Sequence, residues 1–106
     1  SHCKKGVLCV IDEKPVGCDI EQIPEKLNMS VCRKCFNEDE IDKILNADNP
    51  CVEFTKFWTK KEALLKLSGI GITVDLKNIL NKENTFDKSI QTIVCEEKGY
   101  VYSVIT

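Results

Sequence analysis

The longest helical pattern in this chain is Phe54-Thr-Lys-Phe-Trp-Thr-Lys-Lys-Glu-Ala-Leu-Leu-Lys-Leu-Ser-Gly69. At about 100° per residue, one broad arc collects its large apolar side chains, which predicts an amphipathic helix that ends at residues 68–69. The arc consists of Phe54, Phe57, Trp58, Leu64 and Leu65, and Ala63 is predicted to point away from it. Lys61 falls in the middle of the arc, with Glu62 and Lys66 beside it.

This placement of charge leaves two interpretations of the helix open. In the first, Lys61 lays its stem along the edge of the core, and Glu62 and Lys66 form an ordinary helical ion pair. In the second, the helix carries acid and base to the rim of a site for a phosphorylated ligand or a metal ion. The second interpretation requires further carboxylates from elsewhere in the chain.

Composition narrows the class of protein. At 106 residues, the chain is one domain at most, residues 1–106, and it can bury a core without structural metal or disulfides. A net charge of −2 with interspersed signs provides no basic face for nucleic acid. The apolar runs are only a few residues long, so we expect no transmembrane helix, and no secretory signal is visible.

The seven cysteines point to a reducing compartment. Their number is odd, their spacing is irregular, and several fall inside apolar segments, which is typical of a cytoplasmic protein. Only Cys32 and Cys35 are spaced as a metal or redox pair. A zinc site needs two more ligands, and Cys3, Cys51 and His2 offer no second close pair.

The carboxylates that the helix requires are found in the N-terminal part of the chain. Residues 6–11 and 16–20 are predicted to form a hairpin around a turn at 12–15. Period-two alternation of the second strand puts two carboxylates, Asp19 and Glu21, on one face beside Gly17, roughly 7 Å apart. The opposite face, with Val16, Cys18 and Ile20, is predicted to face the core. The two acids are either a solvated strand end or oxygen ligands for a hard divalent cation.

The remaining pattern completes an α+β domain. Residues 27–35 suggest a short helix, and Asn37 with Glu40 forms a capping-box pattern ahead of a second helix. The apolar face of this second helix is predicted to consist of Ile41, Ile44 and Leu45. Residues 72–76 are predicted to be extended, residues 77–89 a loop with a short helical piece, and residues 90–96 and 100–105 a final hairpin turning at 97–99. We therefore expect helices packed against an antiparallel sheet.

Two motifs in this arrangement carry a family resemblance. The first is Val16-Gly-Cys-Asp19, and the second, 39 residues after that aspartate, is Trp58-Thr-Lys-Lys-Glu-Ala-Leu-Leu-Lys66. Together they resemble the signature of the 4′-phosphopantetheinyl transferases, a V/I-G-x-D strand followed at this distance by W/F-S/T-x-K-E-A/S-x-x-K. Every fixed position is filled here. Three further matches resemble the D-I-E, F-S-x-x-E and S-H elements of the surfactin-synthetase type: Asp19-Ile-Glu21, Phe36-Asn-Glu-Asp-Glu40 and Ser1-His2.

The resemblance implies a reaction and a site. Such an enzyme transfers the phosphopantetheine arm of coenzyme A to a serine of an acyl or peptidyl carrier protein, as in fatty acid biosynthesis, and releases 3′,5′-ADP. It implies Mg²⁺ held by Asp19, Glu21 and Glu62, with Lys61 and Lys66 near the phosphates. Glu62 and Lys66 would be catalytic, and the base would be Glu62 itself or a metal-bound water. His2 matches a residue that contacts the 3′-phosphate of coenzyme A, or it is an ordinary terminal residue.

The resemblance also bears on how much of an enzyme this chain represents. Members of the surfactin-synthetase type have two similar halves with coenzyme A bound between them, and this chain resembles the second half plus the last strand of the first. The small single-half relatives, the acyl-carrier-protein synthases, are trimers whose aspartate strand starts almost at the N-terminus. We therefore expect a fragment or an unusually short member, with an exposed apolar face where a missing N-terminal half docks or where the chain self-associates.

Two other classes of function stay open at this stage. The chain could be a non-catalytic module of the same fold that binds coenzyme A or a carrier protein. It could also be a cysteine-based metal or redox domain built on Cys32 and Cys35, which predicts zinc in the purified protein.

Overall fold

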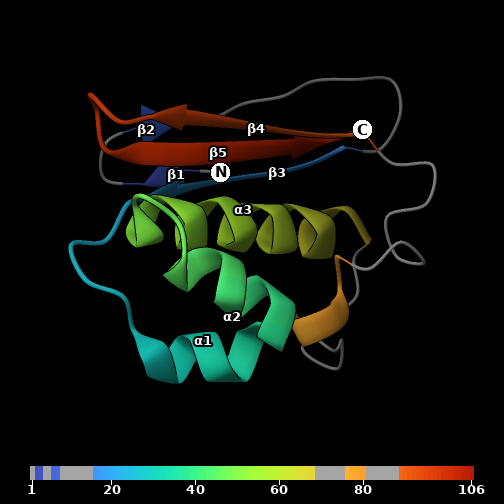
Figure 1. Cartoon of the computed structure of the whole chain (residues 1–106). Helices are drawn as coiled ribbons and strands as arrows, with labels where there is room; N and C mark the ends of the chain where they lie inside the picture. The colour runs from blue at the N-terminus through green and yellow to red at the C-terminus, as the bar shows by residue number, and fades with distance from the viewer. Residues whose placement is uncertain (1, 4–5, 8–15, 69–75, 81–88) are drawn as a thin grey trace.

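The structure is a computed structural model, and it describes residues 2–3, 6–7, 16–68, 76–80 and 89–106. In these ranges the order of elements is β1 (His2–Cys3), β2 (Gly6–Val7), β3 (Gly17–Gln22), α1 (Met29–Cys35), α2 (Glu38–Leu45), α3 (Pro50–Ser68), the 3₁₀ helix η1 (Leu76–Asn78), β4 (Ile90–Cys95) and β5 (Tyr100–Ile105). Figure 1 shows a sheet above the long helix α3, with α1 and α2 below it. This layered arrangement confirms the predicted α+β fold.

The main sheet has the order β3-β5-β4, and both pairings are antiparallel. The predicted final hairpin is confirmed as β4 and β5, and its turn places Gly99 at a φ of 77°, which glycine adopts without a Cβ penalty. The partner of β3 in this sheet is β5, while β1 pairs with β2. The hairpin predicted from residues 6–11 and 16–20 depends on residues 8–15, which lie outside the described ranges, as does most of the segment predicted to be extended at 72–76.

The prediction that only the face of β3 with Val16, Cys18 and Ile20 meets the core was wrong, because both faces carry buried residues. Gly17 and Asp19 are buried, and the Cβ of an alanine at position 17 would lie 2.1 Å from the carbonyl oxygen of Ala63 and 2.7 Å from the Cβ of Leu67. Helix α3 therefore covers the face that carries the carboxylates. Ala63, predicted to point away, is fully buried in this contact. Small residues on helix and strand allow the close approach, and Ile20, on the other face, is buried too.

The aromatic part of the apolar arc of α3 packs on the opposite side, against α1 and α2, whereas Leu64 and Leu65 join a cluster with Ile79 and Ile105. Phe36, fully buried between α1 and α2, makes edge-to-face contacts with Phe54 and Trp58 at ring-centroid distances of 5.3 and 6.3 Å. Helix α3 is thus buried on two sides. Small residues face the sheet, where the backbones approach closely, and aromatic residues face α1 and α2. Ile44 of α2 joins this core, whereas Leu45, predicted to do so, is 50% exposed.

Local capping explains where the short helices begin. Asn28 caps α1 by accepting a hydrogen bond from the Val31 amide. The predicted capping box of α2 is confirmed: the Asn37 side chain accepts from the Glu40 amide at 2.9 Å, and the Glu40 side chain accepts from the Asn37 amide at 3.0 Å. The chain therefore turns sharply between α1 and α2 at Phe36.

Three further expectations concern an exposed apolar face, the cysteines and membrane-spanning helices. The exposed large apolar side chains within the described ranges are Leu45 on α2 and Ile93 on β4, which belong to different layers, so a docking face for a missing half stays a prediction. Cys32 is a buried core residue, and its pKa is raised by that burial. None of the helices described here combines the length and hydropathy that a membrane crossing requires.

Candidate active site

The two sequence motifs meet where α3 crosses β3. Lys66 Nζ donates a hydrogen bond to Asp19 Oδ1 at 2.8 Å, joining residues 47 positions apart. The Asp19 side chain is 3% exposed, and the Lys66 side chain is 47% exposed. The buried carboxylate of Asp19 is thus paired with the half-exposed ammonium group of Lys66.

Glu21 and Glu62 belong to the same electrostatic cluster. Burial raises the pKa of Glu21 from its ordinary 4.5 to about 7, aided by the charge of Asp19, a hydrogen bond with Asp19 and the charge of Glu62. Burial and the charge of Asp19 also raise the pKa of Glu62. Burial alone would lower the pKa of Lys66, but its hydrogen bond to Asp19 and the charges of Asp19 and Glu62 raise it overall. Three carboxylates therefore share one lysine, and the cluster favours an additional cation.

The chemistry of these donors fits a hard divalent cation such as Mg²⁺, which prefers carboxylate oxygens. Within the part of the chain that the structure describes, no three His, Cys, Asp or Glu side chains are already grouped as a metal site. Asp19, Glu21 and Glu62 would have to converge further to bind one ion together. Burial is the main cause of the raised pKa of Glu21, and the repulsion by Asp19 and Glu62 that adds to it is the part that a cation would relieve.

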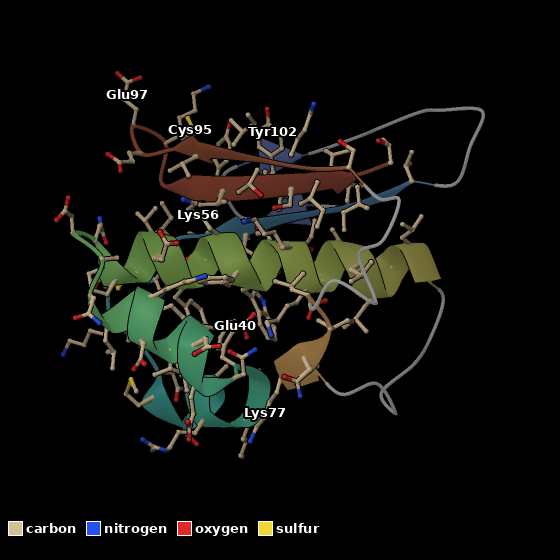
Figure 2. All side chains as sticks on the ribbon, turned by 45° about the vertical axis from the view of Figure 1, so that its right-hand side comes forward. Glu40, Lys56, Lys77, Cys95, Glu97 and Tyr102 are labelled. Atoms are coloured by element: carbon tan, nitrogen blue, oxygen red, sulfur yellow. The ribbon has the colours of Figure 1, made fainter. Side chains whose placement is uncertain are left out.

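Lys61 lies elsewhere, on the side of α3 that faces away from the sheet. Its side chain is fully buried, and Nζ donates to Glu40 Oε1 at 2.7 Å, to the Cys35 carbonyl at 3.0 Å and to the carbonyls of Leu76 and Lys77. Figure 2 shows Glu40 and Lys77 on this side, below α3. Lys61 is therefore neither a surface lysine nor a neighbour of the Asp19–Lys66 pair, and both interpretations of the helix missed its position.

A pocket of about 430 Å³ lies on this same side, between α1, α2 and η1, and is lined by Arg33, Phe36, Asn37, Glu38, Ile41, Lys77 and Asn78. It is remote from the carboxylate cluster. We assign it no role in the candidate site, because the groups with perturbed pKa values that could do chemistry lie on the sheet side of α3.

The other sequence-predicted residue is His2. It lies in β1, where it pairs with Val7 of β2. Its proposed contact with the 3′-phosphate of coenzyme A stays a prediction.

Sequence reasoning missed two groups of buried polar residues. One is the Lys61–Glu40 pair. The other is a set of hydroxyls: Ser103 Oγ lies 2.8 Å from Thr59 Oγ1 and 2.8 Å from Thr92 Oγ1. The alternation of β5 places Ser103 with the buried Val101 and Ile105, a signal that could have found it. Thr59 lies opposite the apolar arc of the helix, so the helical pattern carried no such signal.

Comparison with known proteins bears on the family. A model of the 4′-phosphopantetheinyl transferase superfamily matches residues 15–104. The chain is 34% identical over 80 residues to 4′-phosphopantetheinyl transferase psf-1 of Bacillus pumilus, covering 74% of this chain and 34% of that protein. It is 31% identical over 100 residues to 4′-phosphopantetheinyl transferase gsp of Aneurinibacillus migulanus, covering 92% and 40%. It is 28% identical over 78 residues to 4′-phosphopantetheinyl transferase Sfp of Bacillus subtilis (strain 168), covering 72% and 34%.

These curated relatives are much longer than the present chain, which matches 34 to 40% of their length. The match nevertheless includes both motifs and all the helices described above. The chain belongs to the 4′-phosphopantetheinyl transferase superfamily, of the surfactin-synthetase type.

Proposed function

We propose that this chain is the cation- and phosphate-binding half of a Mg²⁺-dependent 4′-phosphopantetheinyl transferase. The reaction moves the 4′-phosphopantetheine group from coenzyme A to a serine of an acyl or peptidyl carrier protein and releases 3′,5′-ADP. The observation that carries the proposal is the contact between Lys66 and the buried Asp19, which unites the two motifs beside Glu21 and Glu62. The name of the relatives supports the reaction class.

Each residue of the cluster has a proposed role. Asp19, Glu21 and Glu62 would hold Mg²⁺, which when bound supplies charge neutralisation at the pyrophosphate of coenzyme A. Lys66 is partly exposed and can leave Asp19 to pair with a phosphate oxygen. Its raised pKa keeps it charged for this purpose.

The chemical step is a displacement at phosphorus. The serine oxygen of the carrier protein forms a bond to the phosphorus that bears the pantetheine arm, and the bond from that phosphorus to the departing 3′,5′-ADP oxygen breaks. The serine proton must go to a base, and Glu62 is the candidate. Burial and the charge of Asp19 raise its pKa, which makes this carboxylate a stronger proton acceptor than an exposed glutamate.

His2 and Lys61 have different proposed roles. We retain His2 as a proposed contact of the 3′-phosphate, by resemblance alone. We assign Lys61 to the support of the helix instead of the phosphates, because its fully buried ammonium donates to the Glu40 carboxylate and to main-chain carbonyls.

A second candidate function is a module that binds coenzyme A or a carrier protein without turnover. The observation in its favour is that the chain matches only 34 to 40% of the length of its curated relatives. A site between two halves would then need a second copy or a separate N-terminal half. A cytoplasmic location stays a prediction from the cysteine usage.

The test is a calorimetric titration of coenzyme A into the 106-residue chain, with and without Mg²⁺, followed by a transfer assay with a carrier protein. We expect binding that depends on Mg²⁺ and is lost in Asp19→Asn. Asp48→Asn, an exposed aspartate before α3, serves as the control and should bind normally. Binding without transfer favours the second function, and equal binding by both variants refutes the assigned cation site. Stoichiometric zinc in the purified protein would instead favour a cysteine-based domain.

A further inference from the structure

A line of hydroxyl groups crosses the interface between α3 and the sheet. Thr92 of β4, Ser103 of β5 and Thr59 of α3 are joined through Ser103 Oγ, with both oxygen–oxygen distances 2.8 Å. Thr59 and Ser103 are fully buried. Buried hydroxyls cost stability unless they are hydrogen-bonded, so these contacts are constraints on the packing as well as sources of stability.

The direction of these hydrogen bonds follows from one further acceptor. Thr59 Oγ1 donates to the carbonyl oxygen of Lys56 at 3.1 Å, so its only proton is used within the helix. Ser103 must then donate to Thr59, and Thr92 must donate to Ser103. All three hydroxyl groups therefore donate in the same direction, from the sheet toward the helix.

This line of hydroxyl groups lies beside the candidate site. Ser103 is the register partner of Asp19 in the β3–β5 pairing, so the two side chains are neighbours on the face that α3 covers. On α3, Thr59 lies three residues before Glu62 and seven before Lys66, which places all three on one side of the helix. The Thr59–Ser103 bond and the Lys66–Asp19 bond therefore tie the same helix to the same sheet.

We infer that Thr59 and Ser103 are positioning residues that fix α3 on the sheet so that Lys66 and Glu62 meet Asp19. The other contacts of this interface, such as Gly17 against Ala63, allow a close approach but are non-directional. A directed hydrogen bond adds what they lack, because it has one favoured position along and around the helix axis. The consequence for metal binding rests on the proposed function, whereas the consequence for the Lys66–Asp19 pair does not.

The chain provides a matched control in Thr55. It lies one turn earlier on α3, is likewise buried, and also donates to its own helix, to the Cys51 carbonyl at 2.6 Å. The hydrogen bonds found for Thr55 stay within the helix, whereas Thr59 reaches Ser103 on β5. Thr55→Val and Thr59→Val thus remove the same hydroxyl group from the same helix. Only Thr59→Val also removes a hydrogen bond to the sheet.

The first experiment is a double-mutant cycle in urea unfolding that needs no metal. Lys66→Met should lower the unfolding midpoint equally in the wild-type chain and in Thr55→Val. In Thr59→Val it should lower the midpoint by clearly less, because the ion pair is already displaced. Equal shifts in all three backgrounds would overturn the inference. If Thr59→Val does not fold, Ser103→Ala replaces it in the same cycle.

The second experiment measures Mn²⁺ binding to the same variants by calorimetry. We expect the Mn²⁺ dissociation constant to rise about tenfold in Thr59→Val, as is typical when a group supporting metal ligands is removed. It should stay unchanged in Thr55→Val and be restored in Thr59→Ser. Equal affinity in Thr59→Val and Thr55→Val contradicts the inference. Absence of Mn²⁺ binding by the wild-type chain would count against the proposed function, and the unfolding cycle would still decide the inference.

Discussion

The two sides of α3 carry the same type of interaction in opposite surroundings. Lys61 pairs with Glu40 at 2.7 Å and Lys66 pairs with Asp19 at 2.8 Å, and both carboxylates are buried. The Lys61 side chain is fully buried and surrounded by carbonyl oxygens, whereas the Lys66 side chain is 47% exposed and faces three carboxylates. Two ion pairs of nearly equal length thus differ in surroundings, so pairing distance alone does not identify a functional site. What separates the two is whether the lysine can change partners.

The largest effect should come from the buried pair. Glu40→Gln or Lys61→Met leaves one charge uncompensated in the interior and should lower the free energy of unfolding by about 3–5 kcal/mol. Chemical denaturation of the single variants and of the double variant measures this. The double variant should lose less than the sum of the two. If either single variant lost less than about 1 kcal/mol of unfolding free energy, the Lys61–Glu40 ion pair would be no stronger than an ordinary surface ion pair.

An intermediate effect is expected where α3 touches β3. Gly17→Ala introduces a Cβ only 2.1 Å from the main-chain oxygen of Ala63, and the resulting shift of the helix should cost about 1–3 kcal/mol. Because the nearest atom belongs to the main chain, adding Ala63→Gly should not restore stability. Restoration in the double variant, measured by thermal unfolding, would show that the contact is made by side chains.

A smaller effect is expected from Lys66→Met. The lysine is well exposed, so solvent screening limits its contribution to stability to about 1 kcal/mol. Its loss should nevertheless weaken coenzyme A binding, measured by calorimetry, whereas Lys61→Met should leave binding intact below its unfolding temperature. The reverse order of binding defects would mean that the functional side of α3 is the one facing α1 and α2.

A pH dependence is expected from Glu21, and the partial exposure of this side chain to solvent reduces its effect on stability. Its pKa in the folded chain, about 7, lies above the ordinary 4.5, so the folded state holds the proton over a range where the unfolded chain has released it. Without metal, the wild-type chain should therefore lose stability relative to Glu21→Gln as pH rises from 4.5 to 7, and no further above that. Urea midpoints of both proteins across this range test the sign. If the wild-type chain instead gained stability relative to Glu21→Gln as pH rises, the surroundings of Glu21 would favour its charged form.

Much of the fold could be predicted from local signals. The capping box at Asn37 and Glu40, the end of α3 near residue 68 and the β4–β5 hairpin are each decided by a few neighbouring residues. The face of β3 that meets α3 was not, because alternation alone cannot say which side a helix covers. Apolar residues occupy one face, and the small Gly17 that admits the helix occupies the other.

The candidate site shows the same division. Asp19, Glu21, Glu62 and Lys66 could be named from their motifs, and the structure brings them together. The position of Lys61 could not, because it depends on carbonyl groups of α1 and η1 that are distant in sequence. The hydroxyls of Ser103 and Thr92 were missed for a similar reason, since their partner is on another element.

The most direct test of this comparison pairs two carboxylates, Asp19 on the sheet side of α3 and Glu40 on the other. Mg²⁺ affinity and the unfolding midpoint would be measured for Asp19→Asn and Glu40→Gln in the full chain. We expect Asp19→Asn to fold but to lose Mg²⁺ binding, and Glu40→Gln to be less stable but to bind Mg²⁺ normally while folded. Undiminished Mg²⁺ binding by Asp19→Asn, or its loss in folded Glu40→Gln, would contradict the assignment of the two sides.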